Sequence, residues 1–315
     1  MSKLKHLKKA VAAFNRQVSE GHYATEPCSC LCGANHFWRI CRHDSGGMWA
    51  PTVLCCECGL IYTEPRLTRE AVRQFYNSGD FKSTCSVFEY IEGGTRADGQ
   101  GSEIFAVMQP LMVSRDLHSV FEVGCSTGYN LPRFAAVGHR VSGCDLTPAL
   151  VERGRRQGLE IYEGSEENIR GTHDVIILSH VMEHFADFFS SMQAVCRHLS
   201  PQGLLFIAVP NMDNFYAGQI QTGHHYYFSP RTLTRYVEQC GLRQIASGVS
   251  EKQHMYGVFE RGAGSAVAGS SGEARRMRRT VRRGLWLSRL SRLLDYVGLR
   301  QRMERWYWQR GKQNS

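Results

Sequence analysis

The sequence has no long hydrophobic run. No stretch approaches the roughly 18 uninterrupted apolar residues that a membrane-spanning helix needs, so any contact with a membrane should be peripheral. Residues 1–20 also lack the continuous apolar core of a secretory leader and carry four lysines instead. We therefore expect a cytoplasmic protein, at most peripheral to the inner face of the membrane, whose twelve cysteines are reduced or bind metal.

Most of the chain also lacks net charge. The formal net charge is +9 over 315 residues, whereas residues 273–315 alone contain thirteen Arg or Lys against three acidic residues. The remainder is thus close to neutral, which disfavours a broad nucleic-acid-binding face outside this tail. With 42% hydrophobic and 21% charged residues, the chain can bury one full-sized core and a small accessory unit.

A short apolar strand with a glycine-spaced turn lies near the middle of the chain. Residues 119–128 read Ser-Val-Phe-Glu-Val-Gly-Cys-Ser-Thr-Gly, and Gly124 and Gly128 permit a tight turn that approaches a ligand closely. The next expected strand, 140–145, ends in Asp145, roughly 20 residues further on, the interval at which a carboxylate reaches ribose hydroxyls. The pattern predicts an α/β sheet that binds a nucleotide-like ligand at its carboxyl edge.

From about Ser102 to Glu260 the chain resembles the class I S-adenosylmethionine-dependent methyltransferases. The resemblance implies a Rossmann-like sheet of seven strands, the last one antiparallel. The later strands of this sheet would be 173–179, 203–211, 243–249 and 254–260.

The same resemblance implies a set of residues that bind S-adenosylmethionine. They are Glu122, Gly124, Cys125, Ser126 and Gly128 at the methionine part, Asp145 and Leu146 at the ribose, Ser165 and Glu166 at the adenine, and Ser179 and His180 after the fourth strand. Ser126 departs from the usual Gly-x-Gly-x-Gly pattern, in which the middle residue is glycine. This change should narrow the turn without abolishing it.

Residues 124–128 also match the Gly-x-Ser-x-Gly turn of serine hydrolases, with Ser126 as the nucleophile. That nucleophile normally follows several strands of its sheet. The upstream residues here are cysteine-rich or helical, and Glu122 and Asp145 would have no function in a hydrolase. The pattern therefore favours the methyltransferase.

Seven of the twelve cysteines lie between Cys28 and Cys58. Residues 55–59 read Cys-Cys-Glu-Cys-Gly, the spacing of a zinc knuckle, and residues 28–33 offer three further thiolates before a glycine. We assign Cys32, Cys55 and Cys58 as zinc ligands, with Cys28 or Cys30 as the fourth. A closed four-thiolate site cannot activate water, so this zinc would be structural. The alternative is a set of free thiols.

The segment after this cluster carries a second resemblance. Residues 58–65, followed by Phe75 and Tyr76, resemble the N-terminal zinc-binding segment of bacterial sugar methyltransferases and related glycan-modifying enzymes. This implies methyl transfer to a sugar, a glycan precursor or a related small metabolite. An RNA methyltransferase is the main alternative, although residues 179–182 read Ser-His-Val-Met where a base methylase has an Asn-Pro-Pro-Tyr-like motif. A non-catalytic cofactor-binding module is a third interpretation.

Three histidines are candidates for the general base. His224 and His225 lie in an expected loop before a helix that starts near Ser229, and His184 follows the fourth strand. A neutral imidazole in such a loop could accept the proton of an acceptor hydroxyl. In the alternative, one of the paired histidines packs against Phe228 and the other is solvated.

The expected organisation has five parts. They are a basic amphipathic helix (1–22), a zinc-ribbon-like segment (23–80), the methyltransferase domain (81–262), a small-residue linker (263–272) and a basic amphipathic tail (273–315). Apolar residues recur at helical spacing through much of the tail, with arginines between them. The tail could contact an anionic membrane or pack on the domain, two possibilities that we weigh equally, and RNA binding ranks below both.

Overall fold

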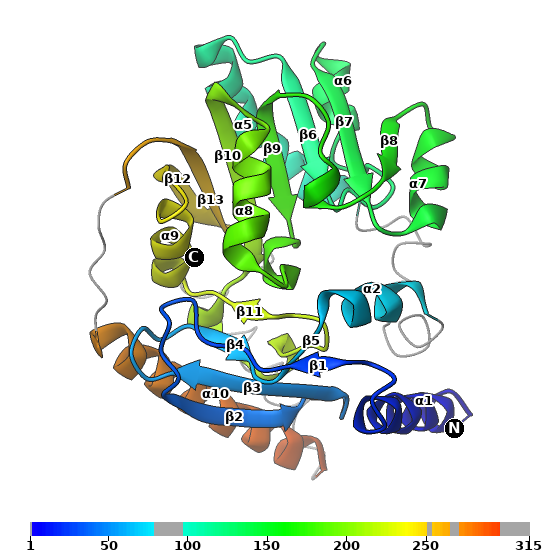
Figure 1. The fold of residues 1–315 in the computed structure, drawn as a ribbon, viewed down its shortest axis with the longest axis vertical. Coiled ribbons are helices and arrows are strands. Elements are labelled where there is room, and N and C mark those ends of the chain that lie inside the picture. The colour runs from blue at the N-terminus through cyan, green and yellow to red at the C-terminus, as the bar shows by residue number, and fades with distance from the viewer. Residues whose placement is uncertain (1, 79–96, 251–253, 265–270, 297–315) are drawn as a thin grey trace, which may run out of the picture.

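A seven-stranded sheet is built from residues 119–261 (Figure 1). This computed structural model describes residues 2–78, 97–250, 254–264 and 271–296. The strand order of the sheet is β12, β13, β10, β9, β6, β7, β8. The strands are β6 (Ser119–Val123), β7 (Arg140–Asp145), β8 (Glu160–Glu163), β9 (His173–Ser179), β10 (Leu199–Pro210), β12 (Leu242–Val249) and β13 (His254–Arg261).

The sheet has the topology expected from the sequence. Strand β13 runs antiparallel to both of its neighbours, while β6, β7, β8, β9 and β10 pair in parallel. The prediction of a Rossmann-like sheet with an antiparallel last strand is confirmed. Strand β10 begins at Leu199, earlier than expected, because an irregularity between Leu199 and Leu204 lets the chain join the sheet before the predicted start.

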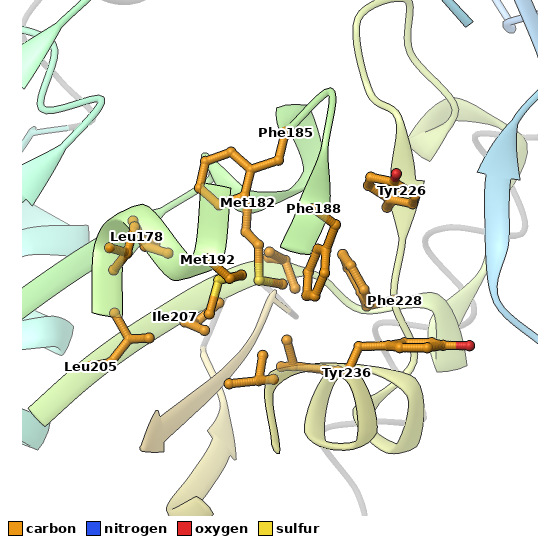
Figure 2. Packing of buried hydrophobic residues seen from close by; sticks show 14 of the residues in the cluster. Leu178, Met182, Phe185, Phe188, Met192, Leu205, Ile207, Tyr226, Phe228 and Tyr236 are labelled. Carbon is orange, nitrogen blue, oxygen red and sulfur yellow. The ribbon is translucent and has the colours of Figure 1, made fainter. Parts of the chain in front are cut away.

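Alternating apolar residues cover both faces of the sheet. Phe121, Ile176 and Leu205 pack on one face, against α8 and α9, whereas Val120 and Val175 face α5, α6 and α7. Figure 2 shows the first of these clusters, in which aromatic side chains fill the space beside the sheet. The helices are α5 (Ala97–Arg115), α6 (Pro132–Ala136), α7 (Pro148–Arg155), α8 (Phe188–Arg197) and α9 (Pro230–Glu238).

The chain order creates a binding edge at the middle of this sheet. From β6 the chain proceeds outward to β7 and β8, and it then returns to the other side of β6 with β9 and β10. Ligands of such sheets bind at this switch point, beyond the carboxyl ends of the strands. The loops after β6, β7 and β9 therefore meet at one place.

A second sheet contains four strands in the order β11, β4, β3, β2. Its strands are β2 (Phe37–His43), β3 (Trp49–Cys55), β4 (Ile61–Thr63) and β11 (Tyr226–Tyr227). Strand β11 follows β10 in the chain and pairs with β4, so the segments predicted as 23–80 and 81–262 share one sheet. Figure 1 shows β11 between the two sheets.

The remaining N-terminal elements pack beside this sheet. They are α1 (Ser2–Ser19), α2 (Arg69–Asn77) and the paired strands β1 (Thr25–Glu26) and β5 (Arg66–Leu67). Phe14 of α1 is fully buried against Tyr23 and Phe75, whose ring centroids lie 5.2 and 5.0 Å away. This aromatic contact orients α2 toward the catalytic sheet.

The first part of the basic tail is a helix, α10 (Ser271–Tyr296), that packs on the four-stranded sheet. Met277 and Val281 are buried against Leu54 and Ile61. Gly284 fits closely, since a Cβ there would lie 2.2 Å from the backbone oxygen of Phe215. One stripe of the helix is thus internal, which matches the alternative in which the tail packs on the protein.

The outer face of α10 carries exposed arginines together with Trp286 and Leu287, which are 61% and 45% exposed. Contact of this face with an anionic membrane stays a prediction that sedimentation with anionic vesicles would test. Residues 297–315 lie outside the described residues. No helix among the described ranges is long and apolar enough to cross a bilayer.

Replacing Val281 by Asp should detach α10 from the sheet. The change removes a fully buried side chain and places a charge in an apolar contact, so the free energy of unfolding should fall by at least about 2 kcal/mol. Thermal unfolding and limited proteolysis would measure this. Leu287→Asp, at an exposed position of the same helix, is the control, and equal effects of the two changes would contradict the packing described.

Candidate active site

The turn after β6 has the backbone geometry of a close ligand approach. Gly124, Ser126 and Gly128 have φ values of +63°, +55° and +77°. A Cβ at Gly124 would lie 2.5 Å from Cγ2 of Val181, and one at Gly128 would lie 2.5 Å from Cδ1 of Leu159. Glycine is needed at both positions, whereas Ser126 holds the left-handed conformation with its side chain present.

Asp145 fixes this turn from the end of β7. Its Oδ2 accepts a hydrogen bond from the backbone N of Ser126 at 2.8 Å, and its Oδ1 accepts one from Thr147 N at 2.8 Å. Burial raises the pKa of Asp145, and the two amide donors oppose this effect. The carboxylate is therefore oriented before any ligand binds.

A pocket of about 690 Å³ opens over this turn. It extends from the ends of β6 and β7 to α2 and to the segment after β9. The predicted cofactor residues that line it are Gly124, Ser126, Asp145, Leu146, Ser165, Glu166 and His180. Glu122, Cys125, Gly128 and Ser179 lie outside its lining. The structure thus gathers most of the predicted set around one cavity.

Glu122 supports the turn from below. It is 1% exposed, and Nδ2 of Asn130 donates to its Oε1 at 2.6 Å. Burial raises the pKa of Glu122 to about 8, although the bond from Asn130 lowers it. Cys125 is also buried and packs among apolar side chains beneath the sheet edge. These contacts are with the protein rather than with the pocket.

Helix α2 supplies a wall of the pocket that sequence reasoning missed. Arg69 and Tyr76 line the cavity, and Arg69 pairs with Glu167. The hydroxyl of Tyr76 lies 2.9 Å from Nδ1 of His184. In the sequence, Tyr76 stands out only as part of the resemblance to the zinc-binding segment of other methyltransferases. Nothing in the neighbouring residues indicated that Tyr76 lines the pocket.

The three candidate base residues lie at different depths. His184 lines the pocket, and its Nδ1 is 3.0 Å from the carbonyl oxygen of Gly223. His224 stacks edge-on behind His184, with ring centroids 4.6 Å apart, and His225 is 2% exposed. Burial lowers the pKa of His184, and it lowers the pKa of His224 and of His225 to about 3. Of the three, His184 alone faces the pocket.

Glu183 is an acidic residue in the site that the sequence analysis did not single out. Its side chain is 1% exposed, and neither carboxylate oxygen accepts a hydrogen bond within the described part of the chain. Nδ1 of His180 lies 3.4 Å from its Oε1. The sequence does place Glu183 directly before the candidate base His184, which could have indicated a role. The burial of the Glu183 side chain could not be predicted from that segment.

The cysteines form a compact four-thiolate cluster. The sulfurs of Cys30, Cys32, Cys55 and Cys58 lie within 4.8 Å of one another, with 3.4 Å between Cys30 and Cys58 and 3.6 Å between Cys32 and Cys55. A tetrahedral zinc with sulfurs at 2.3 Å separates neighbouring sulfurs by roughly 3.8 Å, so the cluster fits this ion. Cys28 lies apart, with its Sγ directed to the carbonyl of Ser29, so the geometry favours Cys30 as the fourth ligand.

Two features of the surroundings suit such a metal cluster. Gly33 and Gly59 close the two cysteine turns with φ values of +79° and +81°. The hydroxyl of Tyr236, on α9, donates to Sγ of Cys58 at 3.0 Å. A hydrogen bond to a ligating sulfur stabilises the thiolate form, and here it also ties the cluster to the catalytic part.

Comparison with known proteins identifies the central part of the chain. Residues 98–247 match the family model of a methyltransferase domain. The match covers just under half of the chain. Among curated relatives, the ubiquinone biosynthesis O-methyltransferase of Xanthomonas oryzae is 29% identical over 102 residues, which are 29% of this chain and 43% of that protein.

Other relatives carry similar names. The ubiquinone biosynthesis O-methyltransferase of a Methylobacterium species is 26% identical over 151 residues, 39% of this chain and 59% of that protein. The chain thus spans about half the length of these curated relatives. A solved structure, the 1,6-didemethyltoxoflavin-N1-methyltransferase of Burkholderia thailandensis, covers 65% of this chain and 96% of its own, at 16% identity and a TM-score of 0.49.

Replacing Asp145 by Ala should weaken the binding of S-adenosylhomocysteine at least about tenfold. A charge-assisted hydrogen bond to the ribose contributes roughly 1.5–3 kcal/mol, and the turn also loses its anchor. Isothermal calorimetry measures the affinity. Glu152→Ala, on the exposed side of α7, is the control and should bind normally; an unchanged affinity of the Asp145 variant would remove the ribose assignment.

Replacing Cys58 by Ser should lower the zinc content by one ion per chain and reduce the melting temperature, because three thiolates hold a structural zinc less tightly than four. Elemental analysis and thermal unfolding are the measurements. Cys56→Ser is a matched control, since Cys56 lies in the same turn but outside the four-thiolate cluster. Equal zinc contents in wild type and both variants would refute the site.

Proposed function

We propose that this protein transfers a methyl group from S-adenosylmethionine to a hydroxyl group of a small molecule. The observation that carries this proposal is the continuity of the pocket, which joins the turn at Gly124 and Ser126 to a polar wall of Tyr76, His180 and His184. A methyl donor held at the turn would direct its sulfonium toward that wall. Under this proposal the donor and acceptor sites would belong to one cavity.

The chain's own residues suit each part of the donor. The amides of the turn can approach the methionine part closely, and Asp145 is oriented by two backbone donors with lone pairs left for ribose hydroxyls. Ser165 and Glu166, at the start of a 3₁₀ turn (Glu166–Asn168), line the end of the pocket expected for the adenine.

The chemistry demands little activation of the donor. The acceptor oxygen attacks the methyl carbon, the carbon–sulfur bond breaks, a carbon–oxygen bond forms, and S-adenosylhomocysteine leaves. The acceptor's proton must also leave, and the imidazole wall of the pocket is where it would be received. Because the sulfonium already carries a good leaving group, the residues of the pocket mainly align the two reactants and exclude water.

A zinc ion in the four-thiolate cluster would supply stability rather than chemistry. All four ligand positions would be filled by Cys30, Cys32, Cys55 and Cys58, so no open position remains for water or substrate. The cluster lies beside β4, and β4 pairs with β11. Its proposed role is therefore to hold the sheet that positions the loop of His224 and His225.

For the acceptor we propose a sugar or a glycan precursor. The resemblance of the zinc-binding segment points to this class, and the polar side chains of Arg69, Glu70 and Arg73 on α2 line the pocket. The curated relatives are named for ubiquinone biosynthesis, which makes a ring hydroxyl the second candidate. No side chain described for helix α10 lines this pocket, so its basic face gives little support to the RNA alternative.

Feeding methyl-labelled methionine to host cells should identify the acceptor class. Cells that carry the intact protein should gain label in the sugar and glycan-precursor fraction, and cells that carry the Asp145→Ala form should not, because the donor no longer binds tightly. Label in a quinone-lipid fraction would select the second candidate. Label gained in RNA would overturn the proposal.

A further inference from the structure

A second group of possible metal ligands lies directly behind the pocket. Glu183, His184 and His224 each offer one carboxylate or imidazole atom, and these three atoms lie within 4.8 Å of one another. Glu183 and His184 come from the 3₁₀ turn after β9 (Met182–His184), whereas His224 comes from the loop before β11. Two segments forty residues apart thus converge on one point.

Three buried atoms of this group make no hydrogen bond within the described part of the chain. Both carboxylate oxygens of Glu183 and Nδ1 of His224 are inaccessible to solvent and make no hydrogen bond within the described ranges. The two side chains belong to residues that are 1% and 7% exposed. Nδ1 of His180, 3.4 Å from Oε1 of Glu183, compensates the buried carboxylate only in part, and a bound cation would lower the remaining cost of its burial.

His184 is oriented as metal-binding histidines usually are. Its Nδ1 lies 3.0 Å from the carbonyl oxygen of Gly223 and 2.9 Å from the hydroxyl of Tyr76. A carbonyl oxygen can only accept, so Nδ1 would carry the proton and donate to it, and the Tyr76 oxygen could accept from the same N–H. The other ring nitrogen then carries the free lone pair. Donation of one ring nitrogen to a backbone carbonyl is the common arrangement that fixes the tautomer of a metal-ligating histidine.

We propose that Glu183, His184 and His224 bind a divalent transition-metal ion at the base of the acceptor side of the pocket. One carboxylate and two imidazoles form a ligand set suited to Zn²⁺, Mn²⁺ or Fe²⁺, and three protein ligands leave further coordination positions open. The four-thiolate cluster differs from this site in both chemistry and openness. The chain would thus hold two metals with separate roles.

The position of the proposed metal ion indicates what it would do in methyl transfer. This role rests on the proposed function. Since His184 lines the pocket, an open coordination position would face the acceptor. An acceptor hydroxyl bound there would release its proton to solvent more easily, because a metal ion stabilises the oxygen anion that attacks the methyl carbon. With one ring nitrogen donating to Gly223 and the other on the metal, His184 would hold the ion and would not receive that proton. The substrate class would then be molecules with a hydroxyl, or two adjacent hydroxyls, able to bind a metal.

Titration with Mn²⁺ tests the site without any measurement of activity. Mn²⁺ prefers oxygen and nitrogen ligands to four thiolates, so it reports on this site in the full-length, zinc-loaded protein. Electron paramagnetic resonance of free Mn²⁺ should show one bound ion per chain. Glu183→Gln and His224→Gln should each weaken binding at least about tenfold, while the exposed-site controls Glu152→Gln and His118→Gln should bind as wild type.

The outcomes separate this inference from the proposed function. Circular dichroism and affinity for S-adenosylhomocysteine verify that each variant is folded. If wild type binds neither Mn²⁺ nor a second zinc ion, the site does not exist, whatever the variants do and whether or not methyl transfer is observed. Equal Mn²⁺ affinity in wild type and both site variants would also overturn it. Metal binding without methyl transfer would support the site and refute the function.

Discussion

The pairing of β11 with β4 is the contact on which the arrangement of the site depends. Two residues, Tyr226 and Tyr227, extend a sheet that is otherwise built from the first 63 residues. Beside this pair, the backbone N of Thr63 donates to the backbone carbonyl oxygen of His225. The hydroxyl of Thr63 donates to the backbone carbonyl oxygen of His224. The backbone N of His225 in turn donates to the backbone carbonyl oxygen of Glu183 at 2.7 Å. One chain of hydrogen bonds thus connects the zinc-ribbon-like segment to the base of the pocket.

Through this sheet the cysteine cluster can stabilise the pocket without lining it. Cys55 ends β3, and Cys58 precedes β4, so a metal at these thiolates would brace the hairpin to which β11 adds. Tyr236 reaches the same cluster from α9. Helix α10 covers the other side of the sheet through Met277 and Val281. The loop of the histidines is therefore held from several directions.

The sequence predicted well which residues gather at the carboxyl edge of the sheet, because the signals for them are local. A glycine-spaced turn after an apolar strand and a carboxylate at the end of the next strand each have a period and a position that can be read within about ten residues. The predicted strand 140–145 coincides with β7, and 173–179 coincides with β9. The acceptor side was less accessible to such reasoning. A two-residue strand has no periodicity, and the bond between Thr63 and His224 spans 161 residues.

Ser126 shows what the glycine-rich pattern of this fold requires physically. Its φ of +55° lies in the left-handed region that glycine adopts most easily, and its backbone N donates to Asp145. The requirement is a residue in the left-handed conformation whose amide can donate to Asp145, and glycine is only the easiest residue with which to meet it. Asparagine and aspartate meet it at modest cost, whereas β-branched residues do not. A motif defined by the left-handed conformation of its middle residue would include chains such as this one. A motif defined by glycine at that position excludes them.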